Sequence, residues 1–130
     1  MDKVVSFLKF IFHTSILLLI VLSLFPGSLA GLLLFGDLAM QPNVVKNPFG
    51  TAINHFIFYF YLSTLGFFIY LRDKKFNYLV YGLFFLAIIL ELLHFIVPKR
   101  TFQLDDLLGN IAGVLIAYFL VKIYLFFKRS

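Results

Sequence analysis

The sequence predicts an all-α membrane protein, built as an antiparallel bundle of four transmembrane helices. Its 130 residues are 62% hydrophobic and only 13% charged, with a mean hydropathy of +1.02, whereas soluble domains are about 45–50% apolar and about 25% charged. A soluble chain of this length could not bury so much apolar surface, because small domains have too much surface for their volume. Four separate segments also approach the roughly 20 apolar residues that a helical span requires.

The predicted spans lie within a single domain, and each ends at a recognisable signal. The domain covers residues 1–130, and the spans cover approximately residues 4–25, 54–71, 77–97 and 105–127. Pro26-Gly27, a pair that stops helices, follows the first span, and Pro98 follows the third. Charged residues end the second and fourth spans, namely Arg72-Asp73-Lys74-Lys75 and Lys128-Arg129.

A short apolar segment, Gly31–Gly36, lies between the first two spans. It is too short to cross a bilayer, so we expect a short re-entrant or interfacial segment at the outer surface. The residues that follow, Gln41–Asn43 and Lys46–Pro48, are typical of an exposed loop.

The N-terminal segment also resembles a cleavable signal peptide, with Lys3 and Lys9 before an apolar run and Ser28-Leu29-Ala30 after it. The run from Phe10 to Phe25 is longer than the usual core of about 7–15 residues. We therefore expect an uncleaved first span. Cleavage after Ala30 is the alternative, and it would leave three spans.

Lysine and arginine residues predict the orientation. With both termini in the cytoplasm, the inner segments contain eight of these residues and the outer segments contain three. The inner ones are Lys3, Lys9, Arg72, Lys74, Lys75, Lys122, Lys128 and Arg129, and the outer ones are Lys46, Lys99 and Arg100. Because Lys and Arg are enriched on the cytoplasmic side of membrane proteins, we expect an N-in, C-in arrangement.

Several kinds of chemistry are excluded by composition. The absence of cysteine rules out disulfides, thiolate catalysis and cysteine-based zinc sites. The net charge of +5 comes from Lys and Arg residues that flank the spans. These residues form no nucleic-acid-binding motif. We therefore expect membrane lipids, and not nucleic acid, among the partners.

Polar residues gather at the outer ends of the last three predicted spans. They are His55, Glu91, His94, Arg100, Asp105, Asp106 and Asn110. Glu91 would lie about 9 Å inside the interface at 1.5 Å per residue, where a carboxylate is costly unless it is paired or protonated. Arg100, His55 and His94 are its available partners.

Helical spacing places these residues on one polar stripe per span. The stripes are His55, Tyr59 and Ser63, then Glu91, His94 and Pro98, and finally Asp106, Asn110 and Gly113. They could serve only to brace the helices, although interhelical polar contacts average about 0.6 kcal/mol. The sequence favours a functional pocket open to the outer face, because ionisable residues inside a membrane are usually functional.

Small residues recur every four positions on the fourth predicted span, at Gly109, Gly113 and Ala117. Such a ridge lets another helix approach closely. We expect the ridge to pack against another helix of the same chain, with dimerisation as the alternative.

The stretch from Glu91 to Gly113 resembles the VanZ-like family. The family pattern is approximately Glu-x-x-Gln, Pro-x-Arg, Asp and then Asn-x-x-Gly, and it is matched here by Glu91, Pro98, Arg100, Asp105 or Asp106, Asn110 and Gly113. His55 followed by Tyr59 is similar to the family's second-span histidine. Two departures are His94 in place of the glutamine and Thr51-Ala52 in place of Asp-Lys.

The resemblance implies a small integral membrane protein of the bacterial cytoplasmic membrane, in a family named after a factor linked to teicoplanin resistance. It implies no settled biochemical activity. We expect a non-enzymatic envelope protein with an outward polar pocket for a lipid headgroup, a lipid-linked wall precursor, a glycopeptide-related ligand or a partner protein. Arg100 and Lys99 would supply charge there, arginine as a bidentate phosphate fork.

A small membrane enzyme acting on a lipid-linked substrate is the alternative. Glu91 and His94 have the spacing of a Glu-x-x-His metal pair, and His55, Asp105 and Asp106 could complete a Glu/His/Asp site. However, the spacing match is short, and no nucleophile motif or phosphate-binding loop accompanies it. We therefore expect no cofactor and no bound metal. A transporter is disfavoured because the four spans contain no evident repeat.

Overall fold

All regular elements of the described residues, 2–130, are helical in the computed structural model, and these residues form no strand. Four helices are long and apolar enough to cross a membrane, which confirms the predicted all-α class. The elements are α1 (Asp2–Leu24), α2 (Leu29–Phe35), α3 (Ala52–Ile69), α4 (Phe76–Leu92), the 3-10 turn η1 (Leu93–Phe95) and α5 (Leu104–Arg129).

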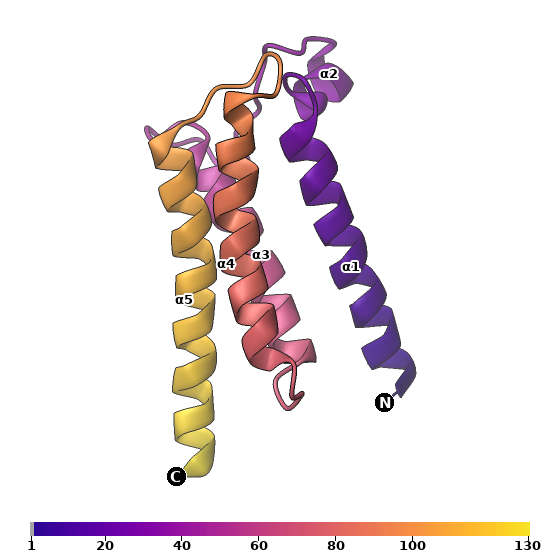
Figure 1. Ribbon diagram of the computed structural model, residues 1–130, viewed down its shortest axis with the longest axis vertical. Coiled ribbons are helices and arrows are strands. Elements are labelled where there is room, and N and C mark those ends of the chain that lie inside the picture. Colours follow the sequence, from indigo (N-terminus) through magenta and orange to yellow (C-terminus); the bar gives the residue numbers. More distant parts are fainter. Residues whose placement is uncertain (1) are drawn as a thin grey trace.

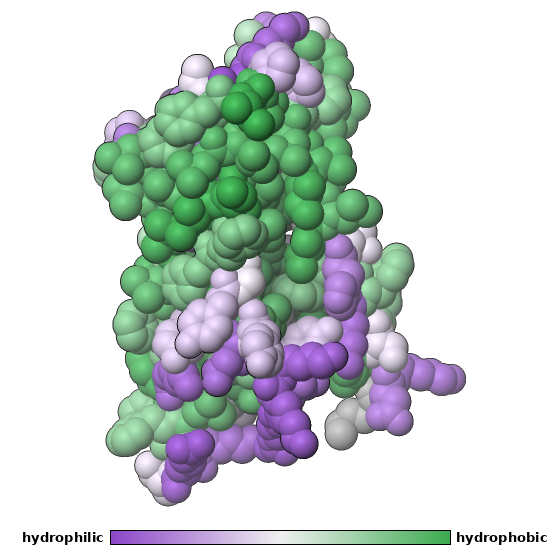
Figure 2. Space-filling model, viewed as in Figure 1, coloured by the Kyte–Doolittle hydropathy of each residue, from purple (hydrophilic) through white to green (hydrophobic). Residues whose placement is uncertain are grey.

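The four long helices run side by side, with both chain ends at one end of the bundle and α2 at the other (Figure 1). The surface of the molecule carries a broad hydrophobic belt, and hydrophilic residues concentrate at the end that holds the termini (Figure 2). Large apolar side chains such as Phe10, Phe85 and Phe119 are more than half exposed. An apolar surface of this extent is typical of a chain solvated by lipid.

The glycines of α5 face α3 at very short range. A Cβ atom on Gly109 would lie 2.5 Å from the Ala52 carbonyl oxygen, and one on Gly113 would lie 2.7 Å from that of Phe56. Ala117 continues the same face and is fully buried. The small-residue ridge therefore packs within the chain, and it brings the first turns of α3 and α5 together.

Helix α4 ends earlier than the sequence predicts, and this corrects the expected polar stripe. The α-helix stops at Leu92, and a tighter turn follows in which the Ile96 and Val97 N–H groups both donate to the Leu93 carbonyl. Pro98 disfavours helix in the residues before it, because its ring clashes with the preceding backbone. Pro98 also has no backbone N–H that could continue the helix. Pro98 consequently does not share a helical face with Glu91.

The apolar segment between the first two spans forms α2, a helix of seven residues that is too short to cross a bilayer. Ser28 caps its start by accepting a hydrogen bond from the Gly31 N–H at 2.9 Å, and Gly36 ends it in the left-handed conformation with φ +69°. A Cβ on Gly31 would collide with the Met40 carbonyl. The chain therefore folds back tightly over α2.

Candidate functional site

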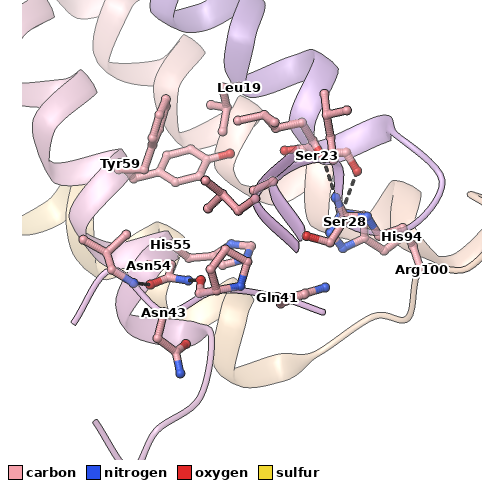
Figure 3. Close-up of a pocket in the computed structure, with 17 residues that line it drawn as sticks. Leu19, Ser23, Ser28, Gln41, Asn43, Asn54, His55, Tyr59, His94 and Arg100 are labelled. Atoms are coloured by element: carbon pink, nitrogen blue, oxygen red, sulfur yellow. Dashed lines mark hydrogen bonds between the residues drawn. The ribbon is translucent and has the colours of Figure 1, made fainter. Parts of the chain in front are cut away.

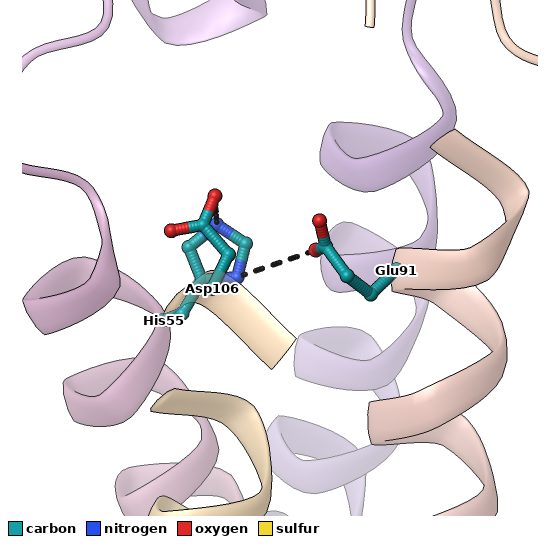
Figure 4. Close-up of side chains that lie close together, drawn as sticks. All are labelled: His55, Glu91 and Asp106. Atoms are coloured by element: carbon teal, nitrogen blue, oxygen red, sulfur yellow. Dashed lines mark ion pairs between the residues drawn. The ribbon is translucent and has the colours of Figure 1, made fainter. Parts of the chain in front are cut away.

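Three ionisable side chains from three different helices meet at the end of the bundle that carries α2. They are His55 of α3, Glu91 of α4 and Asp106 in the first turn of α5 (Figure 4). One potential ligand atom from each lies within 4.8 Å of the other two. Glu91 and Asp106 are buried, and the His55 side chain is 22% exposed.

Asn110 fixes which ring nitrogen of His55 donates a hydrogen bond to it. The Asn110 Nδ2 donates to the Ala87 carbonyl at 3.0 Å, so its Oδ1 faces His55 Nδ1, 2.7 Å away. An amide oxygen only accepts hydrogen bonds, so Nδ1 must carry a proton and donate it. His55 Nε2 then faces Asp106 Oδ2 at 3.4 Å.

Asp106 receives hydrogen bonds from outside its own helix. The Thr51 hydroxyl, just before α3, donates to Asp106 Oδ1 at 2.9 Å and lies 3.1 Å from Oδ2. Thr51 occupies one of the two positions at which the family commonly has Asp-Lys. In this chain Thr51 therefore gives the Asp106 carboxylate a neutral hydrogen-bond donor.

Glu91 is almost completely buried, with 1% exposure, and its two oxygens have different surroundings. Oε1 accepts from the Gln103 backbone N–H at 3.1 Å and lies 3.2 Å from His94 Nδ1. Oε2 has no hydrogen-bond partner, and it lies 4.0 Å from His55 Nδ1. A buried polar atom without a partner is costly, so Oε2 is the least satisfied atom of the cluster.

His94 links Glu91 to the end of α1. Its Nε2 lies 3.0 Å from the Ser23 carbonyl oxygen, which can only accept, so Nε2 carries a proton. A second proton must lie between Nδ1 and Glu91 Oε1, because two lone pairs cannot share a hydrogen bond. The pair therefore holds either an imidazolium with a carboxylate or a neutral imidazole with a carboxylic acid.

Arg100 contacts the last turn of α1. Its Nε donates to the Phe25 carbonyl at 3.1 Å, and Nη2 donates to the Leu22 carbonyl. Carbonyls at a helix C-terminus have no partner within the helix and favour a cation. Burial lowers the pKa of the Arg100 guanidinium, and the nearby Glu91 and Asp106 carboxylates oppose that shift.

Two of the predicted residues lie apart from this cluster. Asp105 is exposed, although it directly precedes the buried Asp106. Lys99 is also exposed and has a positive φ of 61°. The structure thus brings His55, Glu91, His94, Asp106 and Asn110 into one hydrogen-bonded and ionic group, with Arg100 at its edge.

A cavity of about 450 Å³ lies beside the cluster, between α1, α2, the loop after α2 and α3 (Figure 3). Its apolar wall includes Leu19, Leu22, Leu29, Leu34 and Phe58. Its polar wall includes Ser23, Ser28, Gln41, Asn43, Asn54, His55, His94 and Arg100. His55 therefore belongs both to the ionisable cluster and to the wall of the cavity.

Asn54 is a site residue that the sequence did not single out, and Thr51 stood out only as a departure from the family's Asp-Lys pair. The Asn54 side chain accepts from the Val44 N–H and donates to the Pro42 carbonyl, each at 2.8 Å. These bonds hold the loop after α2 against α3. The only sequence signal for Asn54 is its closeness to His55 along the chain.

Four long apolar helices that surround buried ionisable residues define a polytopic integral membrane protein. The chain belongs to the VanZ/LLP1 family, whose model matches residues 5–127, as the motif from Glu91 to Gly113 predicts. No curated protein and no solved structure matches the chain.

Proposed function

We propose that this protein resides in the bacterial cytoplasmic membrane and binds a phosphate-bearing lipid headgroup, free or in a lipid-linked wall precursor, without catalysing a reaction. The observation that carries the proposal is the two-sided lining of the 450 Å³ cavity. An apolar wall suits an acyl or polyprenyl chain, and a polar end suits a headgroup. Pockets that take small molecules combine apolar walls with a few polar groups in this way.

The charges around the cavity favour an anion. Of the described residues that line it, none is acidic, whereas Arg100, His94 and His55 are basic. Two of the three guanidinium nitrogens of Arg100 are engaged by the end of α1. These two bonds fix the position of the Arg100 charge at the cavity and leave Nη1 to donate to a ligand. Because the side chain is already ordered, a bound phosphate would not lose affinity by ordering it.

Orientation connects this cavity to the cell envelope. The concentration of hydrophilic residues at the end with the termini (Figure 2) supports the N-in, C-in arrangement counted from Lys and Arg. In that arrangement the cavity and α2 lie at the outer leaflet, where α2 would rest as an interfacial or re-entrant segment.

The proposal is tested by the lipids that remain bound to the purified protein. Native mass spectrometry in mild detergent should show retention of added phosphatidylglycerol over diacylglycerol, which has no phosphate. Ala30 lines the cavity, so Ala30→Phe should fill it and reduce retention, whereas Ala39→Phe, on an exposed residue outside the lining, should not. Equal retention of the two lipids, or undiminished retention in Ala30→Phe, would reject the proposal.

A second candidate function is a membrane enzyme that acts on a lipid-linked substrate. The specific observation in its favour is the cluster of His55, Glu91 and Asp106 next to the cavity. Turnover of a polyprenyl diphosphate by the purified protein, abolished in Glu91→Gln, would support this function over simple binding.

A further inference from the structure

We infer that His55, Glu91 and Asp106 form a binding site for a divalent transition-metal cation, with Zn²⁺ or Mn²⁺ as the best chemical match. The site is a property of the three helices and does not depend on a lipid in the cavity. It also departs from the expectation of no metal drawn from the sequence. No metal was expected because the Glu91–His94 match to a metal pair is short and no other motif accompanies it. The inferred site does not use His94 as a ligand.

The orientation of His55 is the first argument. Because Asn110 Oδ1 accepts from Nδ1, a neutral His55 presents the lone pair of Nε2 to the Asp106 carboxylate. Two electron-rich atoms face one another unless a cation lies between them. Histidine ligands of metals commonly donate their other ring N–H to an oxygen in this manner, and Asn110 fulfils that role here.

The separation of the two atoms supports a metal over a proton. His55 Nε2 and Asp106 Oδ2 are 3.4 Å apart, longer than the roughly 2.7–2.9 Å of a hydrogen bond between two charged groups. Two ligands bound to zinc at about 2.0–2.1 Å in tetrahedral geometry would be separated by about 3.3–3.4 Å. A cation therefore fits between these atoms without a rearrangement of either helix.

Glu91 Oε2 supplies the third ligand and the independent observation that a ligand is missing. The side chain is 1% exposed, Oε2 has no hydrogen-bond partner, and it faces His55 (Figure 4) at 4.0 Å from Nδ1, so the carboxylate must turn toward Nε2 to reach a shared cation. The other oxygen is already held by the Gln103 N–H. A cation would satisfy Oε2 and offset the two carboxylate charges in a buried place, where uncompensated charge is expensive.

The ligand chemistry identifies the class of cation. One imidazole and two carboxylates favour Zn²⁺ or Mn²⁺, because Mg²⁺ and Ca²⁺ prefer all-oxygen ligands and the chain has no cysteine for softer sites. Two of the three ligands are oriented by hydrogen bonds, because His55 donates to Asn110 and Asp106 accepts from Thr51. The partly exposed His55 at the cavity wall gives the cation a path of entry.

The test uses full-length protein in detergent, stripped with a chelator and titrated with Zn²⁺, Mn²⁺ and Mg²⁺ by calorimetry and by thermal unfolding. We expect one Zn²⁺ or Mn²⁺ per chain, a higher Tm on binding, and little response to Mg²⁺. Asp106→Asn and His55→Ala should weaken binding more than about 100-fold, and Asn110→Ala about 10–100-fold. Matched controls are Asp105→Asn and His13→Ala, at exposed positions, which should bind as the wild type does.

X-ray absorption of the zinc-loaded wild type keeps the inference testable if the ligand variants do not fold. It should show one imidazole with oxygen ligands. Substoichiometric zinc and manganese, unchanged affinity in Asp106→Asn, lost affinity in His13→Ala, or a coordination shell without imidazole would each overturn the site. Lipid retention measured on the stripped protein separates this result from the lipid proposal, because either can fail alone.

Discussion

The His55 imidazole donates a hydrogen bond of 2.7 Å to the side chain of Asn110, which in turn donates to the Ala87 carbonyl. The Asn110 amide thus connects α3, α4 and α5. It also orients the His55 ring so that Nε2 faces Asp106. Asn110 is 1% exposed, so this amide lies inside the bundle.

Asn110→Ala should lower the free energy of unfolding by about 1–3 kcal/mol, because it leaves the His55 Nδ1–H without its acceptor and removes the second donor to the Ala87 carbonyl, which keeps its bond within α4. The measurement is thermal or denaturant unfolding in detergent. Asn77→Ala, at an exposed position near the start of α4, is the control. An equal effect in both variants would contradict the structural role of Asn110.

Gly113→Ala should destabilise the bundle by about 1–3 kcal/mol through overpacking. The new Cβ would lie 2.7 Å from the Phe56 carbonyl oxygen and 2.8 Å from the Phe60 nitrogen, and these backbone atoms cannot move aside cheaply. Gly82→Ala is the matched control in another helix, because its Cβ would meet nothing within 4 Å. There the better helix propensity of alanine should leave the Tm unchanged or raise it.

Arg100→Lys should lower the Tm even though it keeps the charge. Lysine lacks the planar fork that donates to the carbonyls of Leu22 and Phe25 at once. We expect a loss of about 1–3 kcal/mol for the part-buried acceptors left unpaired. Lys99→Arg, on the exposed neighbour, should have no effect. An unchanged Tm in Arg100→Lys would show that the end of α1 does not depend on this side chain.

Glu91→Gln should abolish cation binding and keep the helical fold, with a modestly lower Tm because the amide cannot share the proton that lies between Glu91 and His94. The amide oxygen can still accept from the Gln103 N–H, and the NH₂ group takes the place of the unpartnered Oε2. Glu91→Leu removes the acceptor for both Gln103 and His94, so it should unfold at a lower temperature. Circular dichroism and calorimetry distinguish the two variants, and tight zinc binding by Glu91→Gln would be the contrary result.

Single cysteines test the orientation, because the chain contains none of its own. In intact cells, a membrane-impermeant maleimide should label Asn43→Cys and Lys99→Cys. It should label Lys74→Cys and Ser130→Cys only after permeabilisation. The reverse pattern would invert the arrangement, and an intact mass lacking residues 1–30 would reveal signal cleavage.

The sequence by itself determined the class of protein and the approximate place of the four long helices, apart from the early end of α4 at Leu92. The second span, for example, is predicted at residues 54–71 and forms Ala52–Ile69. Such agreement is expected in a membrane, because each helix satisfies its own backbone hydrogen bonds and its apolar side chains meet lipid whatever their neighbours. The sequence also predicted that the ionisable residues of the candidate site lie at the same end of the bundle.

Only the tertiary structure decided which of those residues meet. Asp105 and Asp106 are adjacent, yet neighbours on a helix point about 100° apart, so the close packing of Gly109 and Gly113 on α3 buries one and exposes the other. Arg100 turns to backbone carbonyls of α1. Those acceptors have no sequence signature, because every residue offers a carbonyl and only the relative placement of the helices selects the ones that lie within reach.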